Sequence, residues 1–140
     1  MQQRLPSQLN PPIAFGHRGA RAHAPENTLE AFELALKLGA NGIESDAWTT
    51  SDGVVVLDHD GVVKSFGRKK PISEVPKSKL PSYMPTLSDV FERCGLTFEF
   101  SIDVKDNFSA LGLVKESENA GFDLQKLWLC HHKIEKTLEI

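Results

Sequence analysis

The 140-residue sequence lacks the usual marks of secreted, membrane and metal-sulfur proteins. Its two cysteines, Cys94 and Cys130, do not have the spacing of a metal site. We expect both to be small core residues, although a disulfide between them stays open. No apolar run approaches the roughly 20 residues of a membrane span. Residues 1–12 are polar and contain prolines, without the apolar segment of a signal peptide, so a cytoplasmic location is expected.

The chain also lacks an excess of positive charge. Its net charge is −3, which argues against a nucleic-acid partner or an anionic membrane surface. We find no internal repeat and no low-complexity segment. The 40% hydrophobic and 25% charged residues are ordinary for a globular protein, and the length predicts one domain or part of one.

Apolar runs of strand length alternate with segments of helical periodicity. Strands are predicted over 13–17, 42–48, 54–59, 96–106 and 124–131. Helices are predicted over 27–39, 85–95 and 109–121, with a partial helix over 133–140. Asn27 with Glu30, and Thr86 with Asp89, resemble capping boxes at two of the helix starts. This order predicts an α/β fold of parallel βα units. Both a doubly wound sheet and a (β/α)₈ barrel have this order of elements.

Two segments stand apart from this pattern. Residues 1–11 are predicted to be an N-terminal extension, and 12–140 to be the domain proper. Within the domain, residues 61–85 are basic and rich in proline, which indicates a long irregular excursion. Loops of this length in compact domains are usually functional or mobile.

The stretch GIESDAWTTSDGVVVLDHDG, residues 42–61, predicts a hairpin that carries acidic residues. If Asp52 and Gly53 form a two-residue turn, His59 lies opposite Asp46 on the returning strand. A turn longer or shorter by one residue would instead move His59 toward Ser45 or Glu44. In each case the returning strand brings His59 beside the acidic pair.

Polar residues gather where the predicted strands end, which favours the mouth of a barrel. Glu44 and Asp46 share one face of their strand because side chains alternate, and so do Asp103 and Lys105. Three converging carboxylates would repel one another unless a pKa rises or a divalent cation binds. Oxygen ligands suit Mg²⁺ or Ca²⁺ rather than zinc.

The histidines and the remaining cations complete this predicted site. His17 and His59 are left free for proton transfer, because imidazole titrates near working pH. Arg18 and Lys105 are the natural partners of a substrate anion such as a phosphate.

The motifs GHRGA, PENT, GIESD and LDHD, followed by PTLSDVF and FSIDVK, resemble those of glycerophosphodiester phosphodiesterases over residues 13–105. The resemblance implies a (β/α)₈ barrel that hydrolyses glycerophosphodiesters to glycerol 3-phosphate and an alcohol with a divalent cation, Mg²⁺ or Ca²⁺. In related enzymes a neighbouring substrate hydroxyl attacks first and gives a cyclic phosphate. By analogy, the general acid/base pair is His17 and His59, the phosphate is bound by Arg18 and Lys105, and the metal is held by Glu44, Asp46 and Asp103.

The sequence departs from the family pattern in three ways. Asp103 stands where the family usually has Glu, so this ligand could act through water, and Gly61 stands where proline is frequent. A full barrel needs about 250 residues, so we expect one truncated after about five βα units. Such a piece would expose apolar inner surface and an unpaired edge. Two alternatives stay open: an inactive remnant that binds phosphodiesters or self-associates through this edge, and a phosphodiesterase for lysophospholipid or sphingolipid head groups.

Overall fold

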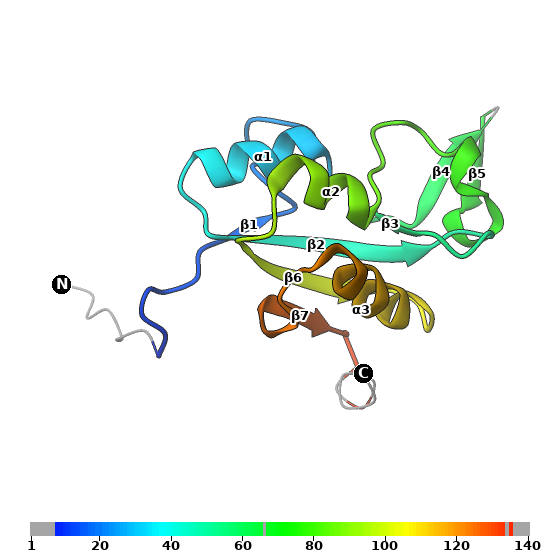
Figure 1. The fold of residues 1–140 in the computed structure, drawn as a ribbon. Helices are drawn as coiled ribbons and strands as arrows, with labels where there is room; N and C mark the ends of the chain where they lie inside the picture. Colours follow the sequence, from blue (N-terminus) through cyan, green and yellow to red (C-terminus); the bar gives the residue numbers. More distant parts are fainter. Residues whose placement is uncertain (1–7, 66, 134, 136–140) are drawn as a thin grey trace.

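The computed structural model describes residues 8–65, 67–133 and 135, and its centre is a parallel sheet (Figure 1). The parallel strands, in spatial order, are β1 (Phe15–His17), β2 (Gly42–Thr49), β6 (Glu99–Val104) and β7 (Leu127–Cys130). The helices are α1 (Leu29–Lys37), α2 (Leu87–Cys94) and α3 (Ser109–Ala120). The predicted α/β class with a parallel sheet is confirmed.

The described part of the chain contains four parallel strands, fewer than the expected five or so βα units. The difference arises at β3 (Val55–Leu57), which pairs with β2 in the antiparallel direction. A strand that returns beside its neighbour adds a hairpin to the sheet without adding a βα unit.

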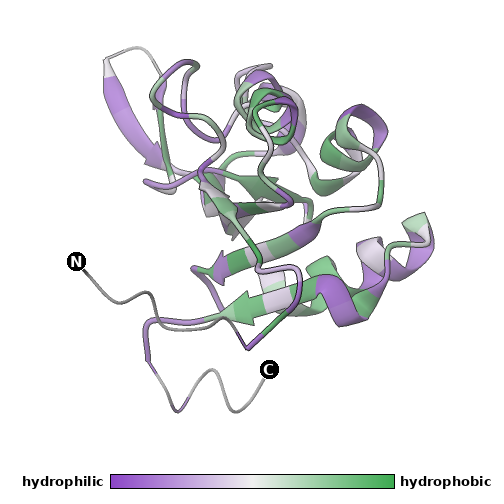
Figure 2. Cartoon of the chain, turned by 90° about the vertical axis from the view of Figure 1, so that its left-hand side faces the viewer, coloured by the Kyte–Doolittle hydropathy of each residue, from purple (hydrophilic) through white to green (hydrophobic). Residues whose placement is uncertain are grey.

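The helices cover one face of the sheet. Alternate residues of the central strands, such as Ile43 and Ala47 on β2 and Ile102 on β6, are fully buried against this helical layer. The cluster includes four phenylalanine rings with neighbouring centroids 4.9–6.5 Å apart: Phe91, Phe98, Phe100 and Phe122. In Figure 2 the helices show alternating hydrophobic and hydrophilic bands, as expected for elements that bury one side.

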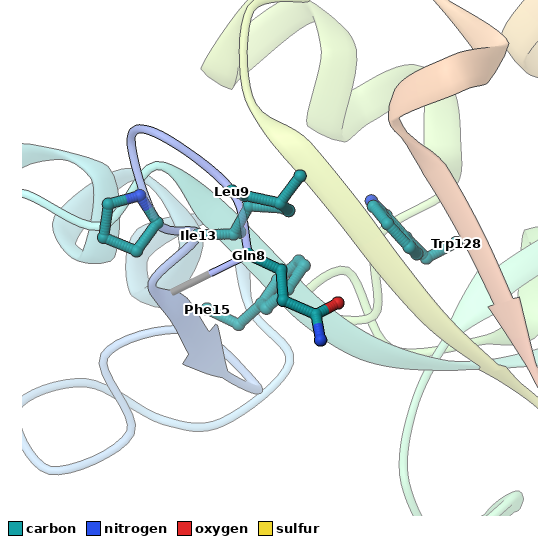
Figure 3. Close-up of a pocket in the computed structure, with 6 residues that line it drawn as sticks. Gln8, Leu9, Ile13, Phe15 and Trp128 are labelled. Atoms are coloured by element: carbon teal, nitrogen blue, oxygen red, sulfur yellow. The ribbon is translucent and has the colours of Figure 1, made fainter. Parts of the chain in front are cut away.

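The opposite face of the sheet is polar toward the carboxyl ends of the strands and apolar at their amino ends. The expected apolar inner surface is therefore confined to a small region. There, a cavity of about 330 Å³ is lined by Leu9, Ile13, Phe15 and Trp128 (Figure 3). The indole N–H of Trp128 donates a hydrogen bond of 2.8 Å to Glu99.

The start of α1 lies one residue later than predicted. Thr28, not Asn27, is the N-cap, and its hydroxyl accepts a hydrogen bond from the backbone N–H of Ala31. The α2 prediction is confirmed, because Thr86 and Asp89 form a reciprocal capping box.

The hairpin register also differs from the predicted one. Ala47 pairs with Leu57 and Trp48 with Val56, so residues opposite each other sum to 104 rather than 105. The cause is a three-residue loop closed by Thr50, in which Gly53 has a φ of +81°. His59 therefore does not lie opposite Asp46 and falls beyond the end of β3.

Residues 61–85 are more regular than their sequence indicates. They contain an antiparallel hairpin, β4 (Val62–Ser65) with β5 (Arg68–Pro71), and two short 3₁₀ helices, at Ile72–Glu74 and Lys77–Lys79. A second buried cluster, which includes Val56, Ile72 and Met84, anchors the segment to the hairpin of β2 and β3. Gly61 begins it with a φ of +69°, and a Cβ there would lie 2.5 Å from the Trp48 ring. Proline, with its φ near −65°, could not take this conformation.

Three further expectations concern the cysteines, the chain end and membrane spans. Both cysteines are free thiols; Cys94 is half-buried against the core, but Cys130 is exposed, contrary to prediction. Cys130 pairs with Asp103 in register and so lies on the open face of the sheet. The partial helix over 133–140 falls mostly outside the described residues. Among the described helices, none has both the length and the apolar character needed to cross a bilayer.

Candidate metal and phosphate site

Three carboxylates meet on the open face of the sheet. Glu44 and Asp46 come from β2 and Asp103 from β6, and the sheet register places Asp46 directly beside Asp103. One oxygen of each lies within 4.8 Å of the others. Burial falls across the group: the side chain of Asp46 is 3% exposed and that of Asp103 is 43% exposed. The predicted convergence of these three residues is present in the structure.

Two cations border the carboxylates. Lys105 Nζ lies 2.9 Å from Asp46 Oδ1 and 3.3 Å from Asp103 Oδ2. Arg18 Nε lies 3.6 Å from Asp46 Oδ2. Burial alone would lower the pKa of Lys105, but its hydrogen bond to Asp46 and the charge of that group outweigh burial and raise the pKa. With every group ionised, the cluster retains one net negative charge.

Glu44 lies between this cluster and the first histidine. Burial raises the pKa of Glu44, and the negative charges of Asp46 and Asp103 raise it further, while a hydrogen bond from the backbone N–H of Arg18 opposes the rise. His17 Nε2 is 3.7 Å from Glu44 Oε2, and the two residues are register partners in β1 and β2. The His17 side chain is 55% exposed.

The loop after β1 turns sharply to aim Arg18 at the carboxylates. Arg18 has a φ of +55°, and its backbone N–H lies 2.9 Å from the Glu44 carbonyl and 3.1 Å from the Glu44 carboxylate. Gly19 follows with a φ of +78°, and a Cβ there would lie 2.6 Å from the backbone of Ala31. Glycine thus lets the loop pack directly on α1. Glu26 accepts a 3.1 Å hydrogen bond from Arg18 Nη1 and holds the far end of the guanidinium.

The sequence pattern assigns Asn27 to a helix cap, whereas the structure places its buried amide in the site. Asn27, 4% exposed, accepts a 2.8 Å hydrogen bond from the Ser45 hydroxyl and donates one of 3.3 Å to Asp46 Oδ2. It also has a φ of +55°, a conformation that asparagine tolerates better than most residues. Asn27 therefore positions Asp46 rather than capping the helix. The only signal in the sequence is its place between Glu26 and Thr28 in the PENT motif.

His59 lies near this group without touching the carboxylates. The backbone N–H of the preceding residue, Asp58, donates a 3.0 Å hydrogen bond to the carbonyl of Asp46. His59 Nδ1 lies 2.8 Å from Asp60 Oδ1, and its side chain is 38% exposed. Within the described residues, no hydrogen bond or ion pair joins His59 to the three carboxylates. The structure thus gathers six of the seven predicted residues and places His59 at their border.

The donor set fits a hard divalent cation. Its members are carboxylate oxygens from two rigid, adjacent strands, which is the ligand type that Mg²⁺ and Ca²⁺ prefer. A divalent ion would change the net charge of the cluster from −1 to +1, which complements the single negative charge of a phosphodiester. Arg18 Nε is buried and has no hydrogen-bond acceptor among the described residues.

The sequence and the fold of the chain match those of known proteins. The family model for the glycerophosphoryl diester phosphodiesterase family matches residues 17–137. A glycerophosphodiester phosphodiesterase of Caldanaerobacter subterraneus is 34% identical over 109 residues, covering 66% of this chain and 45% of that protein. The crystal structure of the glycerophosphodiester phosphodiesterase from Thermotoga maritima superposes with a TM-score of 0.77 at 31% identity. The match covers 88% of this chain and 55% of the Thermotoga chain.

A phosphodiesterase from Oleispira antarctica, solved with its product sn-glycerol 3-phosphate, shares the fold at a TM-score of 0.65 and 22% identity. The match covers 88% of this chain and 58% of the Oleispira chain. The chain spans about half the length of the curated relatives it matches. The family match nevertheless runs through most of the chain and contains every residue of the site described above. The chain belongs to the glycerophosphoryl diester phosphodiesterase family.

Proposed function

We propose that this chain supplies the catalytic residues of a metal-dependent phosphodiesterase that hydrolyses glycerophosphodiesters to glycerol 3-phosphate and an alcohol. The observation that carries the proposal is the convergence of three carboxylates with two cations on one face of a parallel sheet. This arrangement supports binding of a divalent ion and of a phosphodiester at the same place.

The metal ligands in this proposal are Glu44, Asp46 and Asp103. When bound, Mg²⁺ or Ca²⁺ supplies positive charge that stabilises the developing charge on the phosphoryl oxygens. Lys105 and Arg18 bind the remaining phosphate oxygens, and their contacts with Asp46 hold them in place before substrate arrives.

His17 and His59 carry the protons. One imidazole accepts the proton of the attacking hydroxyl, from the glycerol arm or from water, and the other donates a proton to the oxygen of the departing alcohol. His17 Nε2 lies 3.7 Å from Glu44, and His59 is bordered by Asp60, which can hold its ring. When a glycerol hydroxyl attacks, the first product is a cyclic phosphate. In the second step water attacks the phosphorus and gives its proton to the imidazole that acted as acid, the ring P–O bond breaks, and the released glycerol oxygen takes the proton from the other imidazole, which regenerates both. When water attacks directly, proton exchange with solvent regenerates both imidazoles.

A second function, binding of phosphodiesters without turnover, is favoured by one observation. The matched segment is 45–48% of the length of two curated relatives. The proposed metal and phosphate ligands all lie within the matched segment. In this second function the chain binds the metal and the phosphodiester but does not hydrolyse the diester.

An assay of glycerol 3-phosphate release from glycerophosphocholine, with and without a chelator, separates these readings. We expect release that stops on chelation, and a fall of at least about 100-fold in His17→Ala and in His59→Ala. His23→Ala is the matched control, because His23 is an exposed histidine of the same loop region outside the proposed site. Full activity in either His17→Ala or His59→Ala would overturn the proton-transfer roles. Binding of metal and diester without release would favour the second function.

A further inference from the structure

Many of the basic residues of the chain are gathered in one segment. Residues 61–85 contain six of the 16 basic residues but only one of the 19 acidic residues, Glu74. The net charge of this segment is therefore +5, and that of the remaining residues is −8. The overall charge of −3 is an average over two regions of opposite sign, so it does not exclude a partner with an anionic surface.

The hairpin of β4 and β5 carries four of these cations, and we call this group the basic hairpin: Lys64, Arg68, Lys69 and Lys70. All four are exposed, and so is every other residue of β5. Within the described ranges, none of the four forms an ion pair. The described part of the chain therefore does not neutralise the positive charge of the basic hairpin.

The register of the basic hairpin places charges of the same sign opposite each other. Lys64 pairs with Lys69, so their side chains leave the same face of the hairpin, with Cβ atoms roughly 4.5–5.5 Å apart. Like charges in this position destabilise an antiparallel pair. Charge on an edge strand discourages association between strands, but charges of mixed sign would serve that purpose without this cost. A cluster of one sign becomes favourable where a partner supplies the opposite charge.

The basic hairpin lies at the end of the sheet toward which β2 points (Figure 1). Its base is fixed there, because the backbone N–H of Ile72 donates a 2.9 Å hydrogen bond to the carbonyl of Gly61. Gly61 follows His59 by two residues. Val63 and Ile72 are buried in the second cluster, while the four cations face solvent. A surface bound by the basic hairpin therefore lies next to the border of the site that His59 forms.

We propose that the basic hairpin binds the surface of a lipid bilayer that contains anionic phospholipids. Clusters of four or more Lys and Arg residues bind such surfaces, and each cation strengthens binding about fivefold. Three of the four cations are lysines, whose ammonium groups act as point charges and suit a diffuse negative surface. The acidic remainder of the chain repels a long polyanion such as nucleic acid, whereas a flat surface can meet the hairpin alone. Attachment to lipid does not depend on the function proposed above.

Sedimentation of the chain with vesicles tests this attachment. One set of vesicles is phosphatidylcholine alone, and the other contains about 30% phosphatidylserine. A chelator is present throughout, so that no divalent ion at the carboxylates bridges the chain to lipid. At about 0.1 M salt we expect at least about 100-fold stronger binding to the anionic vesicles, and loss of this binding at about 1 M salt, where the Debye length falls from about 10 Å to about 3 Å. Equal binding to the two sets, or binding that survives high salt, would overturn the proposal.

Two triple variants assign the binding to the hairpin. The first removes three of its four charges and should weaken binding to the anionic vesicles about 100-fold: Arg68→Gln, Lys69→Gln and Lys70→Gln. The matched control removes the same number of charges elsewhere and should change binding by less than about threefold: Lys37→Gln, Lys115→Gln and Lys126→Gln. Circular dichroism checks that both variants fold. Equal losses in the two variants would show that net charge, not the hairpin, controls binding, and would refute the assignment.

A single substitution separates attachment from a structural role of the lysines. Lys69→Gln relieves the opposition to Lys64, so Tm without vesicles should stay the same or rise, while binding to the anionic vesicles weakens about fivefold. A lower Tm with unchanged vesicle binding would make Lys69 a structural residue and contradict the proposal. A DNA duplex of about 20 base pairs is titrated at the same salt concentration. Binding of the duplex as tight as that of the anionic vesicles would assign the basic hairpin to nucleic acid instead of lipid.

Discussion

A divalent cation should stabilise the folded chain, and removing one carboxylate from the cluster should abolish most of this effect. The three carboxylates of Glu44, Asp46 and Asp103 are close only in the folded state, because they come from two strands paired in register. An ion that binds them therefore binds the native state and not the unfolded chain. At a free ion concentration of 100 times its Kd, such binding stabilises the fold by about 2.7 kcal/mol.

The expected shift in the melting temperature follows from the size of the chain. For a domain of this length, 1 kcal/mol corresponds to roughly 3–5 °C, so the ion should raise Tm by about 10 °C. Asp46→Asn removes the most buried of the three ligands, and we expect at least about 100-fold weaker ion binding. At the same ion concentration the stabilisation then falls to about 0.4 kcal/mol, a shift of 1–2 °C.

The measurement is thermal unfolding followed by circular dichroism, with Mg²⁺ or Ca²⁺ and with chelator. Each variant is compared with itself with and without the ion, so a loss of basal stability from the Lys105 contact of Asp46 cancels. Asp103→Asn, at the more exposed ligand, is the second variant, and Glu74→Gln, at an exposed carboxylate outside the cluster, is the control. A shift in Asp46→Asn as large as in the unmodified chain, or none in the unmodified chain with either ion, would refute the metal assignment.

Two further predictions concern backbone packing and the thiols. Gly19→Ala should lower the free energy of unfolding, measured in urea, by about 2–4 kcal/mol, because it adds a clash with the backbone of Ala31 to the strain of a positive φ. Gly39→Ala has the same kind of strain but faces open space, so it should lower the free energy of unfolding by only about 1 kcal/mol. Equal losses in the two variants would argue against the close packing at Gly19. At pH 7.5 a thiol reagent should label exposed Cys130 first, because burial, aided by the charge of a nearby glutamate, raises the pKa of half-buried Cys94 to about 11. Labelling of Cys94, followed by mass spectrometry, should speed up roughly tenfold per pH unit up to that pKa, and equal labelling of both thiols near neutrality would contradict this environment.

The acidic cluster could be predicted because it depends on short-range periodicity. Glu44 and Asp46, and likewise Asp103 and Lys105, share a face through the two-residue alternation of a strand, and this holds wherever the strand is placed. The motifs then indicated which strands meet. The direct pairing of Asp46 with Asp103 could not be predicted from the sequence. These residues lie 57 positions apart, and the register of their parallel strands is set by the packing of the sheet on its helices.

The local sequence of the hairpin between β2 and β3 is compatible with two registers that differ by one residue. An Asp-Gly pair suits a two-residue turn, but glycine at a positive φ suits a three-residue loop equally well. Thr50 decides between them. Its hydroxyl accepts a 2.9 Å hydrogen bond from the backbone of Val54 and donates one of 2.6 Å to Asp52, which closes the longer loop. Because the register differs by one residue from the predicted one, Asp58 rather than His59 lies beside Asp46, and His59 falls beyond the end of the strand.

The start of α1 shows how the site overrides a local rule. Asn27 and Thr28 are both good N-cap residues, and the presence of Glu30 favours Asn27. Thr28 caps the helix because the side chain of Asn27 is hydrogen-bonded elsewhere. Its partners are Ser45 and Asp46, which lie 18 and 19 residues further along the chain. If Asn27 capped the helix, its amide could not reach Asp46, and the buried hydroxyl of Ser45 would lose its acceptor. An unsatisfied buried polar group costs more than exchanging one capping residue for another, so the tertiary contact fixes the helix boundary. Local rules fail here because the same residue is needed to hold a carboxylate of the proposed metal site.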